Sequence, residues 1–221
     1  MCSSIVFYVL CGSKNHLSPV ITLLQLATLP LHPEHTKRKM ITSQQIIDQT
    51  KKWIIDVVVG CNFCPFAANP MKQQRVHFEV ETSSSLNVCM DALLQEMKRL
   101  DDDINIETTF LIFPDTFREF EDYLKLVTAA EKLLKQNGYE GIYQLASFHP
   151  LYVFANSSVN DAANYTNRSV YAMLHLLREE SMDRALEHYQ QPEKIPERNV
   201  DFARKKGLTF MKLLRDSCMN S

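Results

Sequence analysis

The alternation of strand-like and helix-like segments between residues 42 and 148 most constrains how this chain can fold. Residues 75–82 alternate apolar and polar positions, which is typical of a half-buried strand, and residues 106–113 form an apolar run that suits a central strand. Residues 142–148 form a third strand-like run. Strands that alternate with helices predict a small, mostly parallel or mixed sheet with right-handed crossovers.

Helix starts and helical spacing mark the intervening segments. Thr42 with Gln45 forms a capping box before the first helix, and Gly60 suits the end of that helix. Thr116 with Glu119 forms a second capping box. Apolar spacing predicts further helices over residues 83–100, 171–179, 181–189 and roughly 201–216. We therefore predict a single α/β domain with a sheet of three or four strands, flanking helices and an all-helical C-terminal end, the fourth strand falling at residues 152–155.

Residues 1–39 differ from the rest of the chain. Their apolar runs are short and interrupted by three prolines, so none reaches the ~20 apolar residues that a membrane helix needs. No basic segment precedes the first run, so a signal peptide fits poorly. Because a helix start follows Met40 at once, we predict a folded domain over residues 40–221. The first 39 residues would be an extension or a misassigned upstream sequence, with a genuine amphiphilic extension as the alternative.

Charge and cysteine usage narrow the class of protein. The formal net charge of -2, with no dominant basic face, argues against nucleic acid and acidic membranes as partners. The six cysteines form no regular framework, and a chain of 221 residues is large enough to fold without one. This usage predicts a reducing, cytoplasmic location. The sequence determines neither a cofactor nor the oligomeric state.

A candidate site follows the strand predicted over residues 142–148. That strand ends at His149, and a polar segment containing Asn164 and Asn167 comes next. Ligands of α/β sheets gather beyond the carboxyl ends of strands, so His149 could act as a general acid or base, or bind an anion or metal. The alternative is a histidine that pins the turn. The two asparagines would cap or shape the same turn.

Three polar residues share one face of the helix predicted over residues 171–179. Tyr171, His175 and Arg178 are spaced i, i+4, i+7, and Arg178 could hold a carboxylate or phosphate with two hydrogen bonds. Arg168 lies just before this helix, where the N-terminal amides would attract the same anion. A solvated helix face is the alternative.

Cys61 and Cys64 form a CxxC pattern with an unusual placement. A redox CxxC normally opens a helix, where the dipole lowers the pKa of the thiol, whereas this pair follows a helix C-terminus. No second CxxC completes a four-sulfur zinc site. A packed or loop-fixing Cys64 is favoured, while a lone nucleophile, a redox dithiol and a metal site stay open.

Several longer motifs resemble the bacterial family catalogued as domain of unknown function 1415. The motifs are CPFA at 64–67, FLIFP at 110–114, QLASFHP at 144–150, ANYTNRS at 163–169, MLHLLR at 173–178 and IPERN at 195–199. The resemblance spans about residues 42–200 in colinear order. The family usually has an apolar residue in place of Cys61, which leaves Cys64 as the supported cysteine. It usually has prolines in place of Val170 and Ala172, and it implies no reaction.

The polar residues of these motifs supply the site hypothesis. They are Cys64, His149, Asn164, Asn167, Arg168, His175, Arg178 and Arg198. Cys64, His149, Arg168 and His175 should line one cleft. We expect an enzyme acting on a small anionic metabolite: Arg168, Arg178 and Arg198 would hold the anion.

In that enzyme His149 or His175 would move a proton, and Cys64 would be a nucleophile or shape the site. The second hypothesis is a metal centre of Cys64, His149 and His175. The third is a non-catalytic binding or regulatory module that uses the same pocket.

Overall fold

A four-stranded mixed sheet forms the centre of the domain. The computed structural model describes residues 41–187 and 189–220. The strands are β1 (Val76–Val80), β2 (Thr108–Phe113), β3 (Tyr143–Phe148) and β4 (Ala172–Arg178), in the order β1-β2-β4-β3. β1 pairs with β2 in parallel, and β4 pairs antiparallel with both β2 and β3. The prediction of a single α/β domain with a small mixed sheet is confirmed.

Helices connect and flank the strands. They are α2 (Ser43–Trp53), which continues as the π-helix η1 (Ile54–Val59), then α3 (Ala68–Lys72), α4 (Leu86–Asp102), α5 (Phe120–Gln136), α6 (Glu179–Leu186), α7 (Ile195–Lys206) and α8 (Leu208–Ser217), with short 3-10 turns η2 (Ala162–Thr166), η3 (Pro192–Lys194) and η4 (Cys218–Asn220). The described chain therefore ends in helices, as predicted.

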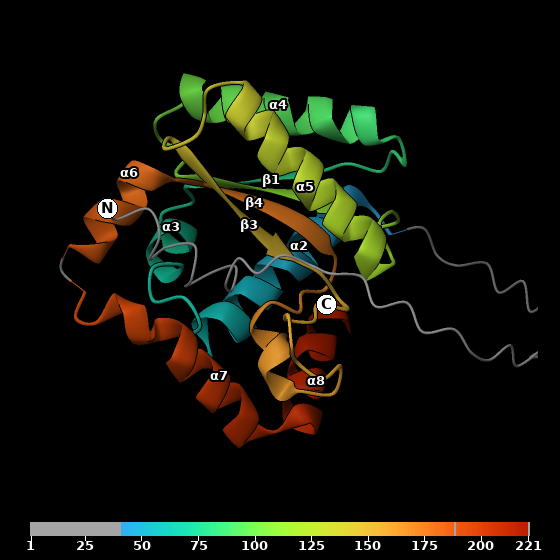
Figure 1. The fold of residues 1–221 in the computed structure, drawn as a ribbon, viewed down its shortest axis with the longest axis vertical. Coiled ribbons are helices and arrows are strands. Elements are labelled where there is room, and N and C mark those ends of the chain that lie inside the picture. Colours follow the sequence, from blue (N-terminus) through green and yellow to red (C-terminus); the bar gives the residue numbers. More distant parts are fainter. Residues whose placement is uncertain (1–40, 188, 221) are drawn as a thin grey trace, which may run out of the picture.

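The sheet lies between two helical layers (Figure 1). Helices α4 and α5 cover one face, and α2, α7 and α8 lie on the other side. Successive side chains of a strand point to opposite faces, so Leu111 of β2 packs in the α4/α5 layer while Phe110 and Ile112 pack in the α2 layer. Every residue of β2 is buried, as its apolar run predicts for a central strand.

The helix predicted over residues 171–179 is wrong, because this segment forms β4, a central strand. Ala172 to Leu177 are all buried, since the strand is covered on both faces. A short run of continuous apolar residues reads equally well as a buried helix, and periodicity alone does not separate the two. The predicted fourth strand at residues 152–155 is also wrong, because this described segment is irregular and pairs with no strand.

The helix boundaries agree with the sequence in part. The capping box is confirmed: the N–H of Gln45 donates to Thr42 Oγ1 at 3.2 Å, and the N–H of Thr42 donates to Gln45 Oε1 at 3.0 Å. The box at residues 116–119 is wrong, since α5 begins at Phe120 without a side-chain cap. The helix predicted over 201–216 is two helices, separated at Gly207, whose φ of 85° breaks the helical path.

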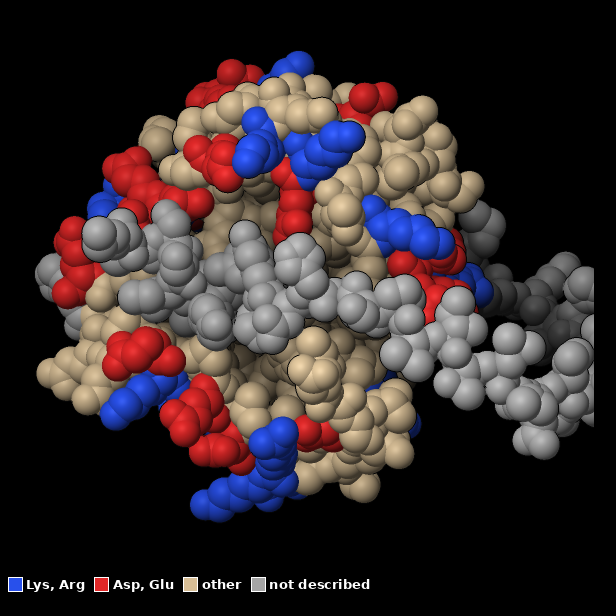
Figure 2. All heavy atoms as spheres, viewed as in Figure 1, with Lys and Arg blue, Asp and Glu red and all other residues tan. Residues whose placement is uncertain are grey.

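The face of the domain in Figure 2 carries side chains of both charge signs. Acidic and basic side chains are interspersed there (Figure 2). None of the described helices is long and apolar enough to cross a membrane. The prediction for residues 1–39 falls outside the described residues.

Candidate functional site

A cavity of about 430 Å³ lies against the α2-side face of the sheet. Its walls come from the end of α2 and η1, the segment from Cys64 through α3, the first residues of β2, the last residues of β4, and α6. Most of the lining is apolar, including Trp53, Ile54, Phe110, Phe148 and Met182. Its polar side chains include Cys64, Thr108 and His175. An apolar cavity with a few polar groups is the usual form of a small-molecule site.

The π-helix η1 positions Cys64 at this cavity. η1 is followed by Gly60, where a Cβ would lie 2.3 Å from the carbonyl oxygen of Asp56, so only glycine fits. Asn62 then takes a left-handed conformation with φ of 55°, and the chain turns back so that the N–H of Phe63 donates to Val58 at 2.8 Å. This turn brings Cys64 to the cavity wall.

Opposing effects act on the Cys64 thiol. Cys64 is 9% exposed, and its burial raises the pKa of the thiol. The backbone N–H groups of Phe66 and Ala67 and the Arg198 charge act in the opposite direction and favour the thiolate. Burial is the larger effect, so the thiol form dominates at neutral pH. The two N–H donors would nevertheless stabilise negative charge when it develops on sulfur.

His175 is held in one tautomer by Thr108. The Thr108 hydroxyl donates to the carbonyl oxygen of Leu176 at 2.5 Å, and its oxygen also contacts Nε2 of His175. A hydroxyl has one proton to donate, so Thr108 accepts from His175 and Nε2 carries the hydrogen. Nδ1 then carries a lone pair, and this buried atom has no hydrogen-bond partner within the described chain.

The surroundings keep the His175 ring neutral. The ring stacks on Phe110 with 3.8 Å between centroids, and the residue is 8% exposed. Burial lowers the pKa of His175 from 6.5 to about 3. A neutral imidazole with a free Nδ1 is a hydrogen-bond acceptor, so a ligand that reaches this nitrogen must bring a donor.

Arg178 borders the cavity, but its guanidinium has structural partners. Its Nε donates to the carbonyl of Ile106 at 3.0 Å, and Nη2 donates to the carbonyls of Asp103, at 3.2 Å, and Leu100. These contacts satisfy carbonyl groups at the end of α4. Because residue 178 is three positions from His175 in a strand, the two side chains point to opposite faces of the sheet, so the helix face predicted for them is wrong.

His149 lies at the other end of the sheet, where it joins two turns. Its Nε2 lies 2.7 Å from the carbonyl oxygen of Phe117, and its Nδ1 accepts from the N–H of Leu151 at 3.0 Å. Both ring nitrogens are therefore used by the backbone, and burial lowers the pKa of the imidazole. This arrangement corresponds to the turn-pinning alternative.

Asn164, Asn167 and Arg168 hold the segment between β3 and β4. Asn164 accepts from the N–H of Phe154 at 3.1 Å and donates to Ser158, and Asn167 donates to the carbonyl of Ser147 at 3.2 Å. Buried Arg168 donates to the carbonyls of Tyr152 and Val159, at 2.9 Å and 2.8 Å. The strand β4, and not a helix, follows residue 169, so the helix N-terminus expected beside Arg168 is wrong.

The remaining two candidates also tie segments together. The Tyr171 hydroxyl donates to Gln49 of α2. Arg198 donates to the Tyr189 hydroxyl at 2.9 Å and to the carbonyl of Asn62 at 2.7 Å, which fixes the turn that precedes Cys64. Arg198 therefore supports the cavity from outside its lining.

The structure brings together part of the predicted set. Cys64, His175 and Arg178 border one cavity, whereas His149 and Arg168 lie outside its lining. Cys64, His149 and His175 do not form a cluster of metal-ligating atoms among the described residues. Of the four residues expected to line one cleft, Cys64 and His175 line the cavity, and His149 and Arg168 do not.

Thr108 is the site residue that the sequence analysis missed. It faces His175 because Thr108 pairs with Leu177 across the β2–β4 ladder, a contact between residues far apart in the chain. No local motif marks such a partner. The only signal in the sequence is the pair of threonines, Thr108 and Thr109, that opens an otherwise apolar strand.

Comparison with known proteins identifies the family of the chain. The family model described as protein of unknown function (DUF1415) matches residues 45–213, which is most of the chain. No curated protein and no solved structure matches the chain. The chain belongs to the DUF1415 family of proteins of unknown function.

Proposed function

We propose that the chain is an enzyme that binds a small organic molecule in the cavity and acts on it through the Cys64 thiol. The observation that carries this proposal is that Cys64 and His175 line one apolar cavity and that the buried Nδ1 of His175 has no hydrogen-bond partner within the described chain. A buried polar atom without a partner costs about 1–3 kcal/mol. A ligand that donates to Nδ1 would recover that free energy.

The cavity chemistry indicates the kind of ligand. Aromatic and aliphatic side chains such as Trp53, Phe110 and Phe148 favour a mostly apolar molecule. His175 is neutral, so it favours a hydroxyl or N–H donor over an anion. The anionic ligand expected from the arginines has less support, because Arg168, Arg178 and Arg198 donate to protein groups.

Cys64 would be the catalytic nucleophile in this proposal: its sulfur would form a bond to an electrophilic carbon of the ligand, and the thiol proton would leave with the group displaced from that carbon. The ligand would lie between the sulfur and His175, and the N–H groups of Phe66 and Ala67 would stabilise charge on sulfur as it reacts. His175 would orient the ligand through Nδ1, since an imidazole with a pKa of about 3 is a weak base.

The raised pKa of the Cys64 thiol favours a second candidate, a non-catalytic binding module that uses the same cavity. The described cysteines Cys61, Cys64, Cys89 and Cys218 are free, which supports a reducing compartment such as the cytoplasm for either function.

A fragment screen read by thermal shift would test the proposal. Ligands of the cavity should raise the melting temperature of the parent and lose this effect in His175→Gln, which keeps a group near Thr108 but lacks an atom at the Nδ1 position. Cys64→Ser should retain binding and lose turnover if the protein is an enzyme. Cys218→Ser is the matched control. Fragment hits that stabilise His175→Gln as strongly as the parent would contradict the proposal.

A further inference from the structure

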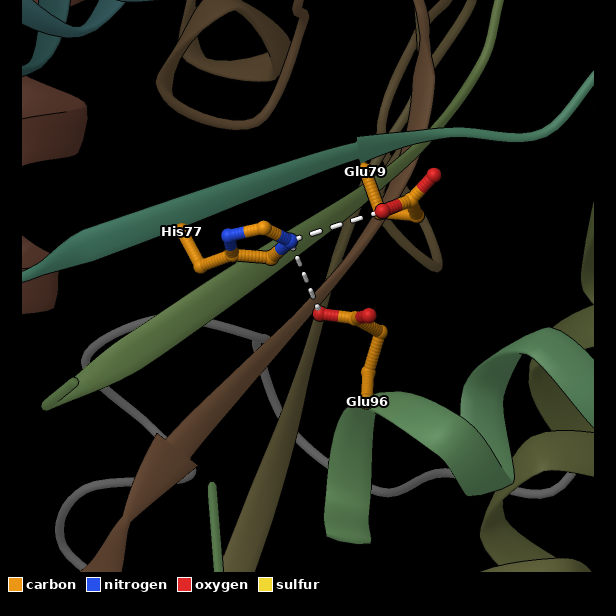
Figure 3. A group of neighbouring side chains, drawn as sticks. All are labelled: His77, Glu79 and Glu96. Carbon is orange, nitrogen blue, oxygen red and sulfur yellow. Dashed lines mark hydrogen bonds and ion pairs between the residues drawn. The ribbon is translucent and has the colours of Figure 1, made fainter. Parts of the chain in front are cut away.

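A second group of ligand-type side chains lies on the opposite face of the sheet from the cavity. His77 and Glu79 are two positions apart on β1, so they point to the same side, and Glu96 reaches them from α4 (Figure 3). The ligand atoms of all three lie within 4.8 Å of one another. Val76 of the same strand lines the cavity, which shows that the two sites face opposite ways.

The spacing of these atoms is long for direct hydrogen bonds. His77 Nε2 lies 3.5 Å from Glu79 Oε2 and 3.7 Å from Glu96 Oε2, whereas N–H···O bonds are about 2.7–3.2 Å long. A single ring nitrogen also has at most one proton to give to two carboxylates. Ligands about 2.0 Å from a tetrahedral zinc ion lie about 3.3 Å apart, so each of the two His77 distances is a few tenths of an ångström longer than in such a site.

Each carboxylate oxygen of Glu96 accepts one hydrogen bond, and Oε2 can still bind a further group. Arg99 Nε donates to Oε1 at 3.0 Å, and the Thr109 hydroxyl donates to Oε2 at 2.5 Å. Oε2 has a second lone pair, and this oxygen is the one that faces His77. Arg99 and Thr109 would therefore orient the carboxylate as outer partners of a metal ligand do.

Charge and exposure also fit a cation. The Glu96 side chain is 1% exposed, so its carboxylate is buried. Arg99 contacts both carboxylates: its Nε donates to Glu96, and its Nη2 lies 3.7 Å from Glu79. With His77 neutral, the cluster carries a net negative charge that a divalent ion would reverse. The side chains of His77 and Glu79 are 28% and 43% exposed, so an ion could enter from solvent and keep water in its open position.

We propose that His77, Glu79 and Glu96 form a binding site for a divalent transition metal of the zinc class. Imidazole and carboxylate groups are ligands that zinc accepts, and three protein ligands leave one coordination position open. The site is independent of the cavity, because the sheet lies between it and Cys64.

Calorimetric titration of the full chain with zinc chloride, after treatment with a chelator and its removal, would test this site. Parent protein should bind zinc at the cluster, and Glu96→Gln should weaken that event at least about tenfold. His77→Ala should do the same, and its partly exposed position keeps the test valid if Glu96→Gln does not fold.

Glu81→Gln is the matched control, since it makes the same change just beyond β1 outside the cluster. It should bind zinc as the parent does, and so should Cys64→Ser. Absence of zinc binding by the parent would overturn the proposal. Equal affinities of parent, Glu96→Gln and His77→Ala would also overturn it, because zinc would then bind elsewhere in the chain.

Discussion

Thr108 accepts a hydrogen bond from Nε2 of His175 and donates its own proton to the carbonyl of Leu176. This pair joins β2 to β4 and fixes the tautomer of the imidazole. It follows that the free nitrogen of His175 is Nδ1, a buried acceptor of a residue that lines a mostly apolar cavity. The chemical preference of the cavity therefore rests on a threonine far from His175 in sequence.

The buried His175 should make the protein less stable as the pH falls below 6.5. Its pKa is about 3 in the folded state and ordinarily 6.5, so between these values the unfolded chain binds a proton that the folded chain does not. Above pH 6.5 both states are neutral and His175 adds no pH dependence. Below it the free energy of unfolding should fall by up to about 1.4 kcal/mol per pH unit.

Urea unfolding of the parent and His175→Gln at pH 7, 6, 5 and 4 would measure this effect. Carboxylates and His149 contribute equally to both proteins, so the difference between the two curves reports His175. The curve of His175→Gln should be flatter. Parallel curves would show that His175 titrates normally in the folded protein.

Arg168 should affect stability more than ligand binding. Its guanidinium donates to the carbonyls of Tyr152 and Val159, and hydrogen bonds of charged groups contribute about 1.5–3 kcal/mol each. Arg168→Ala should therefore lower the free energy of unfolding by at least about 1.5 kcal/mol.

Chemical denaturation would measure this loss, with Arg184→Ala, an exposed arginine on α6, as the control. Phosphate and sulfate should raise the melting temperature no more than chloride at equal ionic strength. A specific phosphate effect that disappears in Arg168→Ala would instead restore the anion site expected from the sequence.

Alkylation should report the raised pKa of Cys64. Burial favours the thiol, so the rate of reaction with iodoacetamide should still increase between pH 8 and pH 10, where an ordinary thiol approaches its maximum. Peptide mapping by mass spectrometry would follow each cysteine separately. Cys89 is the internal control, because burial raises its pKa to about 11. A Cys64 rate that is already constant at pH 8 would show a stabilised thiolate.

Residues 1–39 should be dispensable for folding. The capping box of α2 begins at Thr42, and the family match begins at residue 45. A fragment of residues 40–221 should melt within a few degrees of the full chain in differential scanning calorimetry. A large loss of melting temperature would show that the N-terminal segment contributes to the core.

The sequence predicted the fold where local patterns are strong. The capping box at Thr42 and the apolar run of β2 lead directly to the observed elements. β4 was missed because a strand buried on both faces has lost the alternation that identifies strands. The polar turn at residues 160–169 was located correctly, but its side chains Asn164 and Arg168 donate to the backbone carbonyls of Ser158 and Val159, just before the turn.

The site was harder to predict than the fold. Cys64 and His175 were identified as candidates from motifs, and both line the cavity. Their neighbours depend on strand register and on the turn after η1, which are long-range properties. The sequence also does not indicate that the Arg178 guanidinium donates to the backbone carbonyls of Ile106 and Asp103. These hydrogen bonds form only when the sheet assembles.

The central claim is that the cavity binds a neutral donor through His175 Nδ1. Long-range ¹H–¹⁵N spectroscopy of labelled histidine, during titration with phenols, indoles and amides and with their methylated counterparts, tests it most directly. The free protein should show the Nε2–H tautomer, and at least one donor should shift the Nδ1 resonance while its methylated counterpart does not. An Nδ1–H tautomer in the free protein, or an Nδ1 resonance that no donor shifts, would contradict the claim.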